Sequence, residues 1–370
     1  MQAASSAASK GVPAPDNLLY AFVMSRHGQR TPIMCCKNLP KNVPEDHGQL
    51  TRQGHEQTFK LGFFLRLRYD GFLVADEPDQ LLATHVRLPR CRESLSETVR
   101  GLNFPTSTPL ELDPTRYDLL FQASLIENID LILQAPVAPP AQGDFSCIGD
   151  LLAFIAEKTG APTREKRQKF LVMDSLLTYV AIGNPIPAWA QTIWNVLIDA
   201  DNRMFGLALA GNELRYAENA LREVVETLSQ KFEQGVERPD RLHVFSMSDS
   251  SVYSILKLLD TSYGDHPCFC ASVFFEVFED ASKAKRVQVL LSTETDKDPH
   301  LVDTDKLKNP CELKEFLGVV RDILKSLTAP QPHFAYDSAY RAEINSYVTQ
   351  LVVSKLCHME KHHEESGAIE

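Results

Sequence analysis

The chain has 370 residues, of which 44% are hydrophobic, and a formal net charge of -11 at pH 7. This length is too great for one small core and indicates one large domain with insertions, or two domains. The negative charge and a sequence pI near 5.5 argue against a protein that coats nucleic acid, because phosphate backbones are bound by basic surface. No apolar run approaches the roughly 18 residues that cross a membrane, so we expect a soluble protein with no membrane span.

The amino terminus, MQAASSAASKGVPAPDN, is small and polar and lacks the apolar core of a signal peptide. Residues 1–16 are therefore expected to form a disordered leader. The 8 cysteines are too sparse for a disulfide scaffold, and no CxxC pair suggests zinc or a redox dithiol. Together with the absence of an N-x-Ser/Thr sequon, this favours a reducing compartment, although a large core needs no bridges outside the cell.

Strand and helix patterns alternate in the first part of the chain. The apolar run Leu18–Met24 is typical of a strand buried on both faces. Thr51–Arg68 carries apolar residues at helical spacing, Leu81–Val86 reads as a second strand, and Pro89 opens a second helix. This alternation predicts an α/β fold with a mostly parallel sheet and helices on both faces.

The middle of the chain is predicted to be helical. From about Leu110 strand signals stop, and helical patterns run from Cys147 to about Gln234, with Trp189 and Trp194 in a stripe typical of helix packing. Strand character returns later, and the predicted elements are strands at Leu242–Met247, Val273–Phe278 and Val287–Leu291 and a helix at Cys311–Leu327. We predict an α/β core over residues 17–110 and 236–345, a mainly helical cap over 111–235, and a C-terminal helix with a charged tail over 346–370.

Charged and polar side chains follow three of the predicted strands, at the points where the strands end. They are Arg26, His27 and Arg30 after the first strand, Arg87, Arg90 and Arg92 after the second, and Ser248 and Asp249 after Leu242–Met247. In open α/β sheets, ligands bind outside the carboxyl ends of the strands. Two cationic strand ends and one carboxylate are therefore expected to meet at one edge of the sheet.

These residue types predict hydrolysis of a phosphate monoester. Planar guanidinium groups offer parallel donors that match the oxygens of a phosphate dianion. Nearby positive charge lowers the pKa of an imidazole, so His27 would stay neutral and nucleophilic at mildly acidic pH. A leaving alcohol needs a proton, which a protonated Asp249 could supply. Nucleophile, anion clamp and acid are all side chains, so no metal and no organic cofactor is predicted.

Several stretches resemble the histidine acid phosphatases, in particular the branch that includes prostatic and lysosomal acid phosphatases. SRHGQRTP at Ser25–Pro32 matches the RHGxRxP signature, and GQLTRQGHEQTFKLGFFLRLRYDGFL at Gly48–Leu73 follows the pattern GxLTxxGxxQxxxLGxxLRxRYxxFL. Further matches are Arg90 and Cys91 with Ser94, PAWA at Pro187–Ala190 and CELKEF at Cys311–Phe316. The resemblance spans nearly the whole chain and implies an α/β domain with a smaller helical cap over the site.

The resemblance also implies roles for single residues. His27 would form a phosphohistidine, while Arg26, Arg30 and a third arginine would hold the phosphate. At the second strand end the family reads RSTDxxR, and anchoring this motif on Arg90 puts Thr84 at its leading, phosphate-binding arginine. Arg90 would then be the second arginine of the motif, and Arg87 is a candidate substitute for the missing first one.

The third strand end departs from the family as well. Where the family has a His-Asp pair, Ser248 replaces the phosphate-binding histidine, and Asp249 keeps the aspartate that protonates the leaving group. A lost charge-assisted hydrogen bond costs about 1.5–3 kcal/mol. Two such losses in the transition state predict turnover slower by on the order of a hundred-fold to ten-thousand-fold.

Cysteine placement differs from that implied by the secreted relatives. Cys147 and Cys311 lie where those relatives carry bridged cysteines, but Leu307 stands at the nearest partner position of Cys311. At least part of the disulfide framework is therefore expected to be absent. Cys147 with Cys357 is the one pairing left to consider.

Each candidate residue also has an interpretation without catalysis. RHGQRTP could be a basic turn, Asp249 before SSVYSILKLL could cap a helix, and Arg87 could be a solvated loop residue. No GxSxG elbow supports Ser248 as a second nucleophile. Metal-ligand spacing occurs in the charged tail, where no metal site is predicted, at His358, His362 and His363.

Two functions from different classes remain. The first is an acid phosphatase acting on a small phosphate monoester, favoured by the retained Arg26, His27, Arg30 and Asp249. The second is a catalytically impaired pseudophosphatase that binds an anionic ligand or a protein partner, favoured by Thr84 and Ser248. The resemblance suggests a secreted or lysosomal location and is compatible with a homodimer, neither of which the residues themselves decide.

Overall fold

The computed structural model describes residues 11–34, 36–39, 47–74, 77–104, 110–111, 117–137, 145–163 and 166–326. The described residues up to Ser326 belong to one compact unit. The tail predicted over 346–370, with its three histidines and Cys357, lies outside the described residues, as do Cys35 and most of the leader predicted over 1–16.

The described residues contain an eight-stranded sheet with the order β3-β2-β4-β1-β5-β6-β7, and β8 pairs with β6. Strands β1 to β4 are mutually parallel, and β5 joins them in the antiparallel sense. The five predicted strands are confirmed, and the short strands β3, β7 and β8 are additions. The helix predicted from Cys311 begins at Leu313, because Cys311 and Glu312 form β8. The bounds are β1 Leu18–Arg26, β2 Leu81–His85, β3 Leu110–Glu111, β4 Leu242–Met247, β5 Ser272–Glu279, β6 Lys285–Ser292, β7 His300–Leu301 and β8 Cys311–Glu312.

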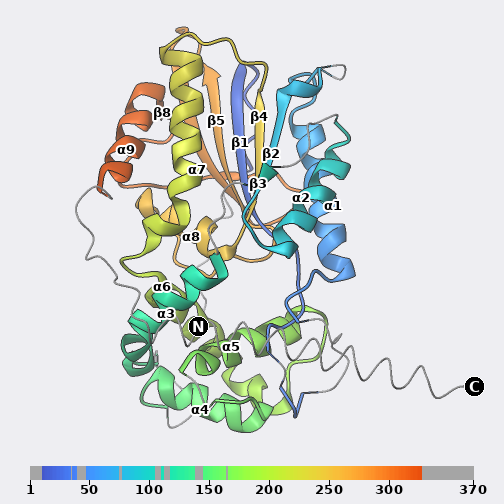
Figure 1. The fold of residues 1–370 in the computed structure, drawn as a ribbon, viewed down its shortest axis with the longest axis vertical. Helices are drawn as coiled ribbons and strands as arrows, with labels where there is room; N and C mark the ends of the chain where they lie inside the picture. Colours follow the sequence, from blue (N-terminus) through green and yellow to red (C-terminus); the bar gives the residue numbers. More distant parts are fainter. Residues whose placement is uncertain are drawn as a thin grey trace, which may run out of the picture. The chain divides into compact units, whose positions relative to one another are not determined.

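Helices cover both faces of this sheet, which confirms the α/β class. Helices α1 (Arg52–Arg68) and α2 (Pro89–Leu102) lie on one face, and α7 (Glu213–Leu228) and α9 (Leu313–Lys325) on the other (Figure 1). In β1, Ala21 and Val23 belong to the core on the α1 side, whereas Tyr20, Phe22 and Met24 belong to the larger core that includes α7 and α9. The strand is a continuous apolar run because both of its faces are buried.

The first residues of α1, α2 and α8 are of types that favour the start of a helix. The Thr51 hydroxyl accepts a hydrogen bond from the Gly54 backbone at 3.0 Å and caps α1, and Pro89 stands in the first turn of α2. Helix α8 (Asp249–Leu258) begins immediately after β4, with Ser248 as its cap. The short helix η1 (Pro78–Gln80) precedes β2, and the short helix η3 (Ser229–Glu233) follows α7.

The helical region predicted in the middle of the chain is also present. It consists of α3 (Tyr117–Gln134), α4 (Ile148–Thr159), α5 (Lys166–Ala181), η2 (Ala188–Ile193) and α6 (Trp194–Leu209), followed by α7. Trp189 packs edge-on against Phe154 at 5.6 Å, and Trp194 also packs against the apolar core, so packing explains both tryptophans. Because α7 packs against α8 and α9, the cap boundary at residue 235 stays a prediction.

Within the described ranges, no helix is both long and apolar enough to cross a membrane. The six cysteines described are free thiols, at Cys36, Cys91, Cys147, Cys268, Cys270 and Cys311.

Candidate active site

Three parallel strands deliver their carboxyl ends to the same edge of the sheet. Arg26 at the end of β1 is level with Met247 at the end of β4, and His85 at the end of β2 is level with Ser246. The segments that follow these strands therefore lie side by side. This is the edge at which the sequence predicts a ligand site.

His27 is fully buried at this edge, with 0% of its surface exposed. The Nε atom of Arg90 lies 2.9 Å from Nε2 of His27, and the Gly28 carbonyl oxygen lies 2.8 Å from Nδ1. A guanidinium can only donate, so Nε2 accepts and the ring proton sits on Nδ1. Burial, with help from Arg90 and Arg26, lowers the pKa of His27 well below its ordinary value. The imidazole is therefore neutral, with a lone pair on Nε2.

Two glycines explain why the RHG stretch and the LTRQG stretch occur together. A Cβ atom on Gly28 would lie 2.3 Å from the Gly54 carbonyl oxygen, and one on Gly54 would lie 2.0 Å from the Gln29 carbonyl oxygen. Only glycine permits this approach of the loop after β1 to the start of α1. The Gly28 amide also donates to Ser94 Oγ at 3.0 Å, which ties the loop to α2.

Arg26 is buried beside the carboxylate of Asp249. Its Nη2 lies 2.8 Å from Asp249 Oδ2, its Nη1 donates to the Pro267 carbonyl, and its guanidinium carbon lies 4.3 Å from the centre of the Phe269 ring. The Nε atoms of Arg26 and Arg30 are buried with no hydrogen-bond partner among the residues described. Buried donors are normally paired, so these two suit the oxygens of a bound anion.

Arg30 connects this edge to α5. Its Nη2 lies 2.6 Å from Asp174 Oδ1 and its Nη1 lies 3.3 Å from Asp174 Oδ2, in a bidentate ion pair. Burial alone would lower the pKa of Arg30, but Asp174 outweighs it and the guanidinium pKa is raised. Gln29 reinforces the link, because its side-chain amide donates to the Ala181 carbonyl at the end of α5 at 2.7 Å.

The residues singled out at the second strand end lie at different depths in the structure. Thr84 lies inside β2, level with Phe245, and its hydroxyl is 3.2 Å from His243 Nε2 in the interior. Met24, the β1 residue at the same level, precedes Arg26 on β1, so Thr84 lies deeper in the sheet than the site. This position gives no support to Thr84 as the place of a phosphate ligand, and the loss predicted there stays a prediction.

Arg90 supplies the guanidinium of this strand end. It reaches His27 from the first turn of α2 as a half-buried cation, although burial and Arg30 lower its pKa. Arg87, the candidate substitute, is exposed, unlike Arg26, His27 and Arg30.

Asp249 is ionised in this arrangement, whereas its predicted role as an acid needs a protonated carboxyl. Burial alone would raise the pKa of Asp249, but Arg26 and His266 outweigh it and hold the pKa well below its usual range. Its Oδ1 accepts a hydrogen bond from the Ser250 amide at 2.9 Å. Asp249 can act as an acid only if something changes these partners, for example an anion that draws Arg26 away.

Ser248 caps the amino-terminal end of α8. Its hydroxyl is buried, accepts from the Ser251 amide at 3.4 Å and shares a hydrogen bond with Ser250 Oγ at 2.7 Å. The hydroxyl thus satisfies the free amide groups of a helix terminus. The predicted substrate contact of Ser248 gains no support from these partners.

His266 is the site residue that sequence reasoning missed. Its Nε2 lies 3.4 Å from Asp249 Oδ2, its Nδ1 lies 2.8 Å from Asp201 Oδ2, and its ring stacks on Phe205 at 3.9 Å. Burial lowers the pKa of His266, but the hydrogen-bonded carboxylates of Asp201 and Asp249 raise it to about 9. The imidazole is therefore an imidazolium at neutral and acidic pH. Asp201, a charged residue among the apolar residues of α6, was the available signal.

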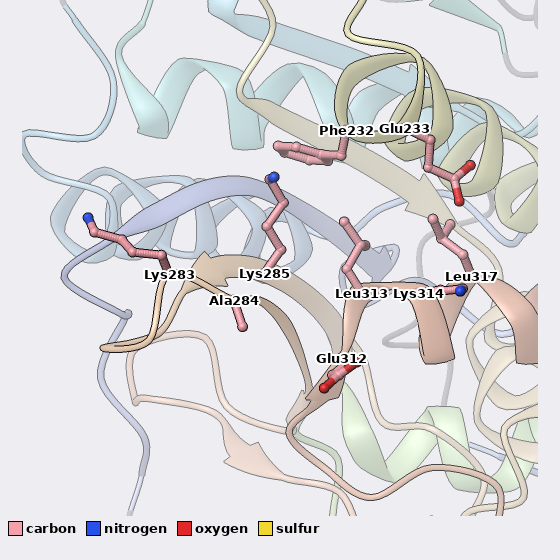
Figure 2. Close-up of a pocket in the computed structure, with 9 residues that line it drawn as sticks. All are labelled: Phe232, Glu233, Lys283, Ala284, Lys285, Glu312, Leu313, Lys314 and Leu317. Carbon is pink, nitrogen blue, oxygen red and sulfur yellow. The ribbon is translucent and has the colours of Figure 1, made fainter.

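A separate hollow of about 350 Å³ lies between η3, β6 and α9, away from these strand ends (Figure 2). Its lining mixes Lys283, Lys285 and Lys314 with carboxylates and the Phe232 ring. Lys283 is held by Glu279 at 2.8 Å. The side chain of Lys283 is largely exposed, so the hollow lies at the surface, unlike the buried side chains at the strand ends.

No protein-family model matches the chain. Lysosomal acid phosphatase of Homo sapiens is 23% identical over 339 residues, covering 83% of this chain and 78% of the relative. The putative acid phosphatase 5 of Caenorhabditis elegans is 24% identical over 306 residues, covering 76% of this chain and 71% of the relative.

Solved structures show the same fold. Hafnia alvei phytase in complex with myo-inositol hexakis sulphate matches with a TM-score of 0.60 at 15% identity, over 84% of this chain and 98% of the phytase. The phytase from Citrobacter braakii matches with a TM-score of 0.56 at 17% identity, over 83% of this chain and 98% of the phytase. The chain is therefore similar in sequence to acid phosphatases and shares the fold of these phytases, with the RHG residues at the carboxyl edge of the sheet.

Proposed function

We propose that the chain hydrolyses phosphate monoesters through a phosphohistidine on Nε2 of His27. One observation carries the proposal: a buried, neutral imidazole has Nδ1 anchored to the Gly28 carbonyl and the lone pair of Nε2 directed at a cation, Arg90. A lone pair in this setting is ready to attack a phosphorus atom whose oxygens the same arginine could bind.

Binding would require the three arginines to exchange partners. Arg26 now holds Asp249, Arg30 holds Asp174, and Arg90 holds Nε2 of His27. A phosphate dianion offers oxygens that match guanidinium groups, so it competes for these donors and for the unused Nε atoms of Arg26 and Arg30. The substrate is then a small phosphate monoester whose phosphate is held by arginine.

The chemical step follows from these positions. Nε2 of His27 forms a bond to phosphorus while the bond between phosphorus and the leaving oxygen breaks, and the leaving oxygen takes a proton delivered by Asp249. Water then attacks the phosphohistidine, the bond between nitrogen and phosphorus breaks, and the proton of the water goes to Asp249. When phosphate draws Arg26 away, the pKa of Asp249 rises, so acidic pH favours the reaction.

The relatives support this reaction class, since the matched curated proteins are acid phosphatases. A second candidate is an impaired pseudophosphatase that binds an anion without turnover. Ser248 favours it, because the residue in the position of the family histidine is a helix cap here. The second loss of a phosphate ligand, predicted at Thr84, gains no support, since Thr84 lies inside β2 beside His243.

Hydrolysis of an aryl phosphate between about pH 4 and 7 tests the proposal, because an aryl leaving group needs little protonation. The parent protein should turn over and His27→Ala should not. The matched control His55→Ala should resemble the parent, because His55 is half-exposed on α1 and contacts Glu97 of α2. Equal, negligible rates for the parent and His27→Ala, with inorganic phosphate still bound, would establish the anion-binding candidate instead. A gain of activity in Ser248→His would then identify the missing group.

A further inference from the structure

An imidazolium lies directly behind the carboxylate assigned to the leaving group. His266 comes from the segment between α8 and β5, and its Nε2 is 3.4 Å from Asp249 Oδ2. Asp249 Oδ2 is also the atom that Arg26 contacts at 2.8 Å. The carboxylate oxygen is thus shared between a guanidinium, which binds anions, and an imidazolium, which can give up a proton.

The position of His266 is set by α6 of the cap. Asp201 binds Nδ1 at 2.8 Å, Asn202 Oδ1 accepts from the His266 amide at 2.9 Å, and the ring lies nearly parallel to Phe205, with an interplanar angle of 9°. Only 16% of the His266 side chain is exposed. These three contacts hold the ring so that its Nε2 points at Asp249. This geometry is typical of a residue that acts through a neighbouring side chain.

We propose that His266 acts through Asp249 as a proton-relay residue in the cleavage of phosphate monoesters with poorly acidic leaving groups, with Asp201 holding the relay in place. This inference rests on the proposed function. His266, from another part of the chain, places an imidazole next to Asp249. Ser248 offers only a hydroxyl there, and that hydroxyl caps α8.

The relay removes a difficulty of the free site. Asp249 there is ionised and carries no proton to give. In the proposed step, the proton on Nε2 of His266 passes to Asp249 Oδ2, and Asp249 protonates the leaving oxygen as its bond to phosphorus breaks and Nε2 of His27 bonds to phosphorus. In the second step, water attacks phosphorus, its proton returns through Asp249 to His266, and the phosphohistidine bond breaks. All protons are accounted for.

The charged groups around His266 suit this role. Asp201 and Asp249 favour the charged imidazole, whereas burial and Arg26 disfavour it, and the balance raises its pKa to about 9. When phosphate draws Arg26 from Asp249, the contact with His266 is left as the principal charged partner of Oδ2. The distance of 3.4 Å in the free site is long, as such hydrogen bonds often are before the substrate binds.

The test compares two esters in the full-length protein, an aryl phosphate that needs little protonation and an alkyl phosphate that needs it fully. His266→Gln and Asp201→Asn should lose about ten-fold to hundred-fold more activity on the alkyl ester than on the aryl ester. The loss should be greater near neutral pH than near pH 4, because solvent can protonate Asp249 directly in acid. His55→Gln on α1 should leave the ratio of the two rates unchanged.

Each outcome decides between the relay and a structural role. Equal losses of His266→Gln on both esters, at all pH values, would mean that His266 only supports the fold and would overturn the relay. Asp201→Asn keeps the shape of the side chain, so it provides the same test if His266→Gln is poorly folded. Failure of the parent protein to cleave even the aryl ester would instead reject the proposed function, and the relay with it.

Discussion

Arg90 and Arg87 stand close together in the chain but in different surroundings. Arg90 donates to Nε2 of His27 from the first turn of α2, whereas Arg87 is exposed. Parallel guanidinium donors bind phosphate through short charge-assisted hydrogen bonds only where they reach its oxygens. At the residue scale, we therefore expect phosphate binding at this strand end to depend on Arg90.

We expect Arg90→Ala to lower kcat/KM by about ten-fold to hundred-fold, which corresponds to a lost charge-assisted hydrogen bond of about 1.5–3 kcal/mol. Arg87→Ala, the matched control from the same segment, should stay within about two-fold of the parent, as is usual for an exposed residue. Steady-state kinetics with an aryl phosphate measure both. A larger effect of Arg87→Ala than of Arg90→Ala would restore Arg87 as the phosphate ligand.

At the scale of elements, α1 and α2 cross at glycines. A Cβ atom on Gly62 of α1 would lie 1.9 Å from the Thr98 carbonyl oxygen, and one on Gly101 of α2 would lie 2.0 Å from the Phe59 carbonyl oxygen. The two backbones thus touch where the glycines meet. This crossing matters for the site because α1 supports the loop of Gly28 and α2 carries Arg90.

We expect Gly62→Ala to lower the free energy of unfolding by about 1–3 kcal/mol, because the added methyl group overpacks the helix crossing. Gly318→Ala is the matched control: this glycine of α9 has no atom within 4 Å of the added position. It should raise the free energy of unfolding by about 0.5–1 kcal/mol, since alanine is the better helix former. Urea unfolding measures both, and similar effects of the two changes would contradict the close crossing.

At the scale of the whole molecule, buried histidines make stability depend on pH. His243 lies in the middle of β4, its ring stacks on Phe245 at 4.0 Å, and burial lowers its pKa from 6.5 to about 3. The unfolded chain binds a proton at this histidine below pH 6.5 that the folded chain does not bind until about pH 3. Acid therefore favours the unfolded chain throughout this window. His27 contributes in the same direction.

We expect the free energy of unfolding to fall between about pH 7 and 4.5, and His243→Phe to reduce that fall by about 2–3 kcal/mol. Phe22→Leu is the control, since Phe22 lies 6.0 Å from the His243 ring and carries no proton. Phe22→Leu should lower the free energy of unfolding about equally at about pH 7 and about pH 4.5. An unchanged pH dependence in His243→Phe would show that the buried imidazole is not the acid-sensitive group.

Local patterns and the family resemblance accounted for most of the fold. The apolar run of β1, the cap at Thr51 and the proline at Pro89 each act on their own neighbourhood, so each can be read from a few consecutive residues. The RHG stretch identified His27, and the alternation of elements gave the α/β class.

Tertiary structure decided what depends on contacts between distant segments. The register of β2 against β4 placed Thr84 below the site, and only the folded chain brings Arg90 to His27. The same holds for Asp249, whose ionisation is set by Arg26 and His266, neither of them adjacent to it in the sequence. The sequence by itself determined the residue types and the elements that carry them. Distances, burial and protonation arise when side chains far apart in the chain share one buried edge, where each charge changes the pKa of the others.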